Sequence, residues 1–127
     1  MNYIPTKSYI KTVLFTAQEQ FVDADGNVLP ISLILEDVNL SRHAFYSLFD
    51  DKATTSKSTA IKIAFAFETS SEQLAEIVNS CGYFFPFTKA DRLIADYFDT
   101  KNFEPEKLDE ILEANNENPL FSKFRRR

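Results

Sequence analysis

The sequence is poor in glycine, cysteine and histidine, and each shortage excludes a class of functional site. Its two glycines, Gly26 and Gly82, stand too far apart to build a glycine-rich phosphate loop. Cys81 is the only cysteine, so no internal disulfide can form. Because His43 is the only histidine, a Cys/His zinc site cannot be assembled, and no nucleophile has an evident neighbouring base.

Long apolar runs are missing as well. No stretch of about 18 apolar residues is present, so no membrane span is predicted. Residues 1–5 lack the basic start and apolar stretch of a signal peptide. The neighbouring acids Glu36 and Asp37, and likewise Asp50 and Asp51, point apart on a helix and do not make a paired-carboxylate site. We therefore expect a cytoplasmic, non-enzymatic protein without a metal or cofactor.

Composition favours a packed core, and the charge is unevenly distributed. Of the 127 residues, 44% are hydrophobic and 26% are charged, which suits a globular domain. Thirteen phenylalanines supply large rings for the core or for a partner. The net charge of −5 argues against indiscriminate nucleic-acid binding. Most of that charge lies in residues 63–122, where twelve Asp or Glu stand against four Lys or Arg.

Apolar residues recur at steps of three and four along most of the chain, which is the pattern of amphipathic helices. The sequence predicts an all-α fold of six or seven helices. The expected helices span residues 7–22, 30–38, 41 to about 49, 56 or 58 to 67, 70 to about 81, 88–98 and 105 to about 114. We expect one domain over residues 1–127, with a helix-turn-helix core at about 7–80, a C-terminal helical extension at about 84–120 and a basic tail at 123–127.

Polar residues mark several helix ends. Ser41 and Thr88 are suitable N-caps, because a hydroxyl can accept an otherwise free backbone N–H. Ser70 and Gln73 have the spacing of a capping box, and Gly82 suits the end of the fifth helix.

Residues 23–27, DADGN, are turn formers that break the chain after the first helix. They share part of a calcium-loop pattern, but the third oxygen ligand before the glycine and the closing glutamate are missing. A short hairpin across residues 21–28 is an alternative interpretation of this segment.

Two sets of apolar residues are expected in the core. Phe84, Phe85 and Phe87, around Pro86, are predicted to close the core between two helix pairs, and an exposed patch is the alternative. The spacing of five other residues places them on the inner faces of consecutive helices. These residues are Phe45, Leu48, Ile61, Phe65 and Leu74.

Residues 40–48, LSRHAFYSL, resemble the turn and recognition helix of the Cro/CI-like (XRE) helix-turn-helix family. In that family an apolar turn residue precedes Ser-Arg, and apolar residues follow at the positions of Phe45 and Leu48. Residues 58–67 resemble the family's next helix, and residues 71–74 resemble its last.

The resemblance is closer to a poorly characterised group of small bacterial XRE-like proteins. Members show Lys-x-Thr-Ala, then Ala/Cys-Gly-Tyr, then Asp-x-x-Ile-x-x-Tyr-Phe, which correspond to residues 57–60, 81–83 and 91–98. The similarity covers roughly residues 7–120. It implies a helix-turn-helix core with an appended helical pair, and DNA binding as the activity.

The resemblance also implies which residues contact DNA. Arg42 is expected to hold a guanine edge through two hydrogen bonds, and Lys52 and Lys57 are expected to contact phosphates. We expect Arg42, Tyr46 and Lys57 to share one solvent-facing surface. The full set of expected DNA-binding residues is Ser41, Arg42, His43, Tyr46, Ser47, Lys52 and Lys57.

Two functions stay open from the sequence. The leading one is a small transcription regulator of a bacterium or phage that binds double-stranded DNA as a homodimer. Residues 125–127 of the basic tail are a further candidate for phosphate contacts, but a terminal charge cluster is more often weakly used. The alternative is a non-enzymatic protein-binding module or inhibitor, for example an anti-CRISPR-like protein, that keeps the fold without DNA binding. Asp50 and Asp51 favour the alternative, because a DNA-facing loop prefers neutral or basic groups. The expected partner surface is then either the acidic face around Asp91, Asp96 and Asp99 or exposed rings among Phe84, Phe85 and Phe87.

Overall fold

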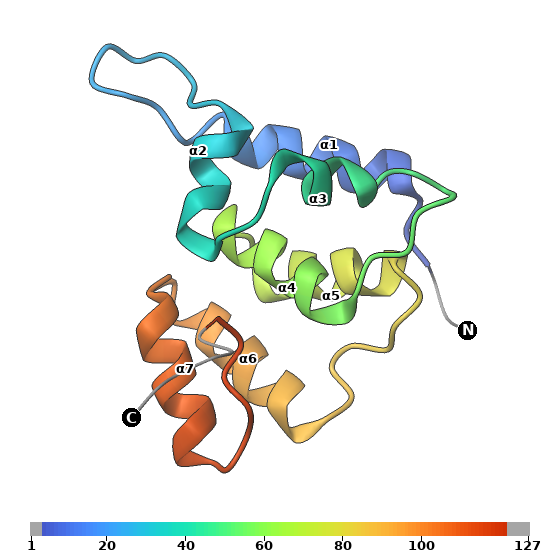
Figure 1. The fold of residues 1–127 in the computed structure, drawn as a ribbon, viewed down its shortest axis with the longest axis vertical. Coiled ribbons are helices and arrows are strands. Elements are labelled where there is room, and N and C mark those ends of the chain that lie inside the picture. The colour runs from blue at the N-terminus through green and yellow to red at the C-terminus, as the bar shows by residue number, and fades with distance from the viewer. Residues whose placement is uncertain (1–3, 122–127) are drawn as a thin grey trace.

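The structure is a computed structural model that describes residues 4–121. Within that range the chain forms seven α-helices and one short 3-10 helix, η1 (Figure 1). Their bounds are α1 Lys7–Gln18, α2 Ile31–Leu35, η1 Glu36–Val38, α3 Arg42–Ser47, α4 Lys57–Ala66, α5 Ser71–Ser80, α6 Lys89–Asp99 and α7 Pro105–Ala114. The predicted all-α class with six or seven helices is confirmed. The basic tail expected at residues 123–127 lies outside the described residues.

Helices α4 and α5 form the centre of the fold. They pack against each other, while α4 also contacts α2 and η1, and α5 also contacts α1 and α6. In Figure 1 the α4–α5 pair lies between α1 and α3 on one side and α6 and α7 on the other. Residues 63–66 of α4 are all buried, as expected for a helix that is covered on more than one side.

Most helices begin where the polar residues predict. Ser41 caps α3, and Ser56, rather than Ser58, caps α4. Ser70 and Gln73 form the predicted capping box at the start of α5. Each of these side chains satisfies a backbone N–H of the first turn, which has no partner inside its own helix. The positions of these helix starts therefore follow from the local sequence.

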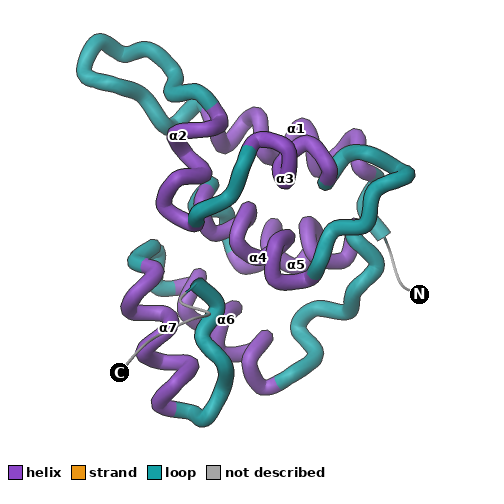
Figure 2. The backbone as a smooth tube through the Cα atoms, viewed as in Figure 1, coloured by secondary structure: helices purple, strands orange, loops and turns teal. Residues whose placement is uncertain are grey.

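The first helix ends earlier than the sequence predicts. It stops at Gln18 instead of Val22, and the chain enters a hairpin in which Val22 pairs with Val28. The Phe21 ring packs edge-on against Phe67 in the core, with their centroids 6.2 Å apart. The loop that carries this hairpin extends away from the helices (Figure 2). The hairpin alternative is therefore the correct one.

The Asp23 carboxylate shapes the tip of the hairpin. Its Oδ1 accepts the N–H groups of Asp25 and Asn27, both at 2.9 Å. The hydrogen bond from the Asn27 backbone is the main reason why the pKa of Asp23 lies below its ordinary value. Gly26 follows with φ of 84°, a conformation that glycine adopts without strain. The residues that share part of a calcium-loop pattern thus serve to form a turn.

The five residues predicted to share a core all lie in it. None of them is more than 3% exposed, and all belong to one continuous cluster that extends from Ile10 to Leu120. The ring of Phe45 contacts four others, with centroid distances of 5.1 Å to Tyr46, 5.7 Å to Phe15, 5.2 Å to Phe49 and 5.4 Å to Phe67. These contacts link α3 to α1 and to the end of α4.

A second group of rings joins α4 to the C-terminal helices. The ring of Phe65 lies 6.4 Å from that of Tyr97, 5.7 Å from Phe98, 5.3 Å from Phe103 and 4.8 Å from Phe121, measured between centroids. Aromatic pairs at these separations attract each other beyond simple burial of surface. The helical pair α6–α7 is therefore attached to the rest of the chain through shared core.

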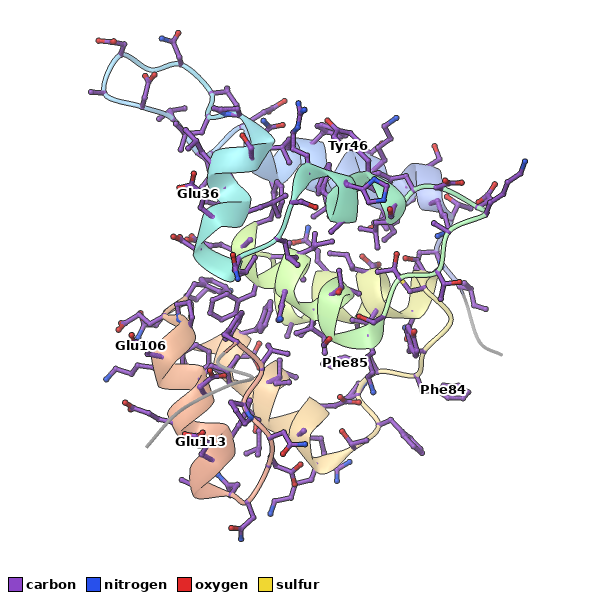
Figure 3. All side chains as sticks on the ribbon, viewed as in Figure 1. Glu36, Tyr46, Phe84, Phe85, Glu106 and Glu113 are labelled. Carbon is purple, nitrogen blue, oxygen red and sulfur yellow. The ribbon has the colours of Figure 1, made fainter. Side chains whose placement is uncertain are left out.

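The apolar link between α5 and α6 follows the prediction in part. Phe85 is buried, with 7% exposure, but Phe84 and Phe87 are 69% and 68% exposed. Figure 3 shows Phe84 projecting away from the chain at the edge of the molecule. The expectation that all three rings close the core is wrong for Phe84 and Phe87, because the ring that reaches inward is that of Phe85, 5.9 Å from the Lys57 ammonium.

Candidate nucleic-acid interface

Two short helices joined by a tight turn lie next to each other at one side of the fold. Helix α2 continues into η1, which ends at Asn39 in the left-handed conformation, with φ of 58°. Asparagine tolerates this conformation better than most residues. The Leu40 N–H donates to the Leu35 carbonyl at 3.2 Å, and Ser41 then begins α3. The turn thus brings α3 into contact with α2.

Helix α3 buries one face and exposes the other. Phe45 is 0% exposed and lies in the core, whereas Arg42 and His43 are exposed and Tyr46 is 47% exposed. Arg42 and Tyr46 are four positions apart and so lie on one face of the helix. Figure 3 marks Tyr46 on α3. The outer face of α3 consequently presents a guanidinium, an imidazole and a phenol to solvent.

The two serines predicted at the interface also take part in the local structure of α3. The Ser41 hydroxyl accepts the Ala44 N–H at 3.2 Å, so it caps α3. Ser47 is half-buried near the end of the helix, and its carbonyl accepts the Asp50 N–H at 3.2 Å. Both residues therefore hold α3 and the following loop in place.

The loop after α3 is fixed at several points. Lys7 of α1 donates from Nζ to the Leu48 carbonyl at 2.9 Å, and the Tyr83 hydroxyl donates to the Thr55 carbonyl at 2.9 Å. Lys52 is exposed in this loop, and its backbone N–H donates to Asp50 Oδ1 at 2.9 Å. The Lys52 side chain is thus displayed by an anchored loop.

Lys57 faces another part of the molecule. Its Nζ lies 2.6 Å from Oδ2 of Asp91 at the start of α6, and its side chain is 27% exposed. The expectation that Lys57 shares a solvent-facing surface with Arg42 and Tyr46 is corrected by this contact, because a carboxylate 34 positions later in the sequence holds its ammonium.

Asp91 is buried, with 3% exposure, and joins three donors. Besides Lys57, its Oδ2 accepts the N–H groups of Phe87 at 2.8 Å and Thr88 at 3.1 Å. Burial raises the pKa of the Asp91 carboxyl, but the hydrogen bonds and the positive charge of Lys57 outweigh burial, so the pKa lies below its ordinary value. Asp91 therefore cannot belong to the acidic partner face expected around it, although Asp96 and Asp99 are exposed.

Acidic side chains flank α3 in the sequence and are exposed in the structure. Glu36 and Asp37 are exposed on η1, before the turn, and Asp50 and Asp51 are exposed in the loop after α3. Figure 3 shows Glu36 at the side of the molecule where α2 ends. These carboxylates repel phosphates, and salt screens that repulsion over about 10 Å at 0.1 M. Charge attraction to any duplex is consequently weak at this surface.

Comparison with protein-family models, with curated proteins and with solved structures finds no match for the chain. Within residues 4–121, no helix combines the length and apolar character that a bilayer crossing requires. In the same range, no three His, Cys, Asp or Glu side chains gather as metal ligands would. The chemistry of the α3 surface is therefore the basis for a functional assignment.

Sequence reasoning missed two residues that support this region. Lys7 holds the carbonyl of Leu48, 41 positions away, and no local pattern indicates such a contact. Asp91 did have a signal, because Thr88 and Asp91 stand at the spacing of a capping box, and the structure shows both of its hydrogen bonds. The sequence analysis identified Thr88 as the N-cap but did not identify Asp91 as the second residue of the capping box.

Proposed function

We propose that this chain is a small helix-turn-helix protein that binds double-stranded DNA through α3. One observation carries the proposal: α3 follows α2 through a tight turn, rests on the buried Phe45 and presents Arg42, His43 and Tyr46 outward. In DNA-binding proteins of this shape, the second helix lies in the major groove and its first turn contacts base edges.

The exposed side chains have distinct roles in the proposed complex. Arg42, in the first turn of α3, donates two hydrogen bonds to a guanine edge. Tyr46 lies beside it one turn later and contacts a neighbouring base or sugar, and His43 contacts the adjacent strand. Lys52 contacts a phosphate from the anchored loop. Lys57 has no part in the complex, because Asp91 holds its ammonium.

We further propose that the protein acts as a symmetric dimer in the cytoplasm of a bacterium. Helix α3 has six residues, so one copy reaches few base pairs, and a second copy doubles the contact. The two copies would read half-sites about 10 base pairs apart on a palindromic duplex. Selection from a pool of randomised duplexes is the measurement that recovers such a site.

Arg42→Ala is expected to weaken binding to the selected duplex by about 1–3 kcal/mol and to relax the base preference at one position. Lys52→Ala is expected to weaken selected and random duplexes alike, and to reduce the salt slope by about one unit. Fluorescence anisotropy at about 50 and 200 mM salt distinguishes the two effects. The acidic neighbours of α3 predict that wild-type protein binds random duplex weakly.

Lys107→Ala is the matched control, because Lys107 is an exposed residue of α7 and the change removes the same charge. We expect it to leave both affinities unchanged. If wild-type protein at micromolar concentration shifts no duplex in about 50 mM salt, where phosphate contacts are strong, the DNA proposal fails. A protein-binding module or inhibitor then becomes the better assignment.

A further inference from the structure

The link between α5 and α6 presents two large rings to solvent, away from the outer face of α3. Phe84 and Phe87 are 69% and 68% exposed, and their centroids lie 6.2 Å apart. A single exposed apolar side chain is ordinary. Two adjacent, exposed phenyl rings form a contiguous apolar surface, and such a surface is more stable when a partner covers it. Phe85 lies between these two residues in the sequence. Its side chain is buried, so it anchors the link to the core.

Two cations accompany these rings. Lys89 donates from Nζ to the Asn115 carbonyl at 3.1 Å, and Arg92 donates from Nη1 to the Phe87 carbonyl at 3.2 Å. Within residues 4–121, no carboxylate forms an ion pair with either of them. The nearest acid in the sequence, Asp91, is buried and already bound to Lys57. The link and the first turn of α6 thus carry two cations without a carboxylate partner, on a chain whose net charge is −5.

We propose that Phe84, Phe87, Lys89 and Arg92, here called the ring–cation patch, bind an acidic peptide segment of another protein that carries a large apolar side chain. The apolar side chain contacts the two rings, and flanking carboxylates of the peptide contact Lys89 and Arg92. Aromatic and arginine side chains contribute most of the energy at protein interfaces, and a carboxylate–arginine pair can form two parallel hydrogen bonds. This binding does not depend on the DNA proposal.

The charges around the patch favour a peptide over a nucleic acid. A single strand could also stack bases on the rings and place phosphates near the cations. A long polyanion, however, also meets the exposed acids Asp96 and Asp99, which follow Arg92 on α6. A short peptide contacts the patch alone and avoids this repulsion.

Phage-displayed random 12-residue peptides, selected on the full chain and depleted on the Phe84→Ala/Phe87→Ala variant, test the proposal. We expect the recovered peptides to be negatively charged and to contain leucine, isoleucine or phenylalanine. A synthetic copy of one recovered peptide should bind at least about tenfold more weakly to Phe84→Ala/Phe87→Ala and to Lys89→Glu/Arg92→Glu. Since all four side chains lie at the surface, circular dichroism should show that both variants are folded.

Lys11→Glu/Lys107→Glu is the control for charge reversal, because both lysines are exposed on other helices, and its affinity should stay within about twofold of wild type. Recovery of neutral or basic peptides, or equal binding to the patch variants, would overturn the proposal. So would tighter binding of a 20-nucleotide oligo-dT than of the peptide. A wild-type dimer that Phe84→Ala/Phe87→Ala dissociates in sedimentation would show instead that a second copy covers the patch. None of these results alters the duplex-binding assay, so the two proposals fail separately.

Discussion

Phe45→Ala is expected to lower the free energy of unfolding by about 3–5 kcal/mol. Phe45 is 0% exposed, and the rings of Phe15, Phe49 and Phe67 surround it. Truncation removes all of these ring contacts and leaves a cavity that the neighbouring helices cannot fill completely. Urea denaturation followed by circular dichroism, on wild type and variant under the same conditions, measures the change.

Phe84→Ala provides the matched control, because it deletes the same side chain from a position that is 69% exposed. We expect the stability of this variant to stay within about 0.5 kcal/mol of wild type. A loss below roughly 1 kcal/mol for Phe45→Ala would mean that the helix carries Phe45 on its surface. The outward orientation of Arg42 and Tyr46 would then be wrong as well, since both follow from the same helical phase.

Asp91→Ala is expected to destabilise the fold by about 2–4 kcal/mol. The change removes the carboxylate that accepts hydrogen bonds from Lys57, Phe87 and Thr88. Two backbone N–H groups at the start of α6 and one partly buried ammonium then lose their partner. Lys57→Met should cost less, because Asp91 keeps both backbone donors. Thermal or urea unfolding of the two variants gives this order, and the reverse order would contradict it.

Asp91 should also make stability depend on pH. The pKa of its carboxyl is lower in the folded chain than in the unfolded one, so the ionised form favours folding. This contribution is complete above the unfolded pKa of about 4 and is lost as the pH falls through the lower folded value. The stability difference between wild type and Asp91→Asn should therefore shrink below about pH 4. A difference that stays constant from pH 7 to pH 3 would show that folding does not lower the pKa of this carboxyl.

The parts of the fold that the sequence predicts well are those fixed by neighbouring residues. Ser41 and Ser70 cap their helices because each hydroxyl needs only a backbone N–H three positions away. Phe45 is placed correctly because helical spacing decides which side faces inward. Such information is present in any short window of the sequence.

The contacts that join distant segments could not be predicted in this way. From the sequence alone, Lys57 is predicted to contact a phosphate. In the structure its ammonium is bound by Asp91, which stands 34 positions later. In the link between α5 and α6, no periodic pattern distinguishes Phe85, which is buried, from Phe84 and Phe87, which are exposed. Helical spacing was therefore sufficient to predict which side chains of α3 are exposed. It was not sufficient for Lys57, whose partner depends on how distant helices pack.

The position of Phe65 makes the burial of α4 depend on the C-terminal part of the chain. It belongs to α4, yet the four rings that cover it come from residues 97–121. A chain that ended after Gly82 would leave Phe65 in water, and apolar surface of this kind promotes aggregation. A premature stop codon beyond the fifth helix should consequently yield an insoluble product, and not a shortened but working protein. Heating should melt all seven described helices in a single cooperative transition, with the same midpoint by calorimetry and by circular dichroism.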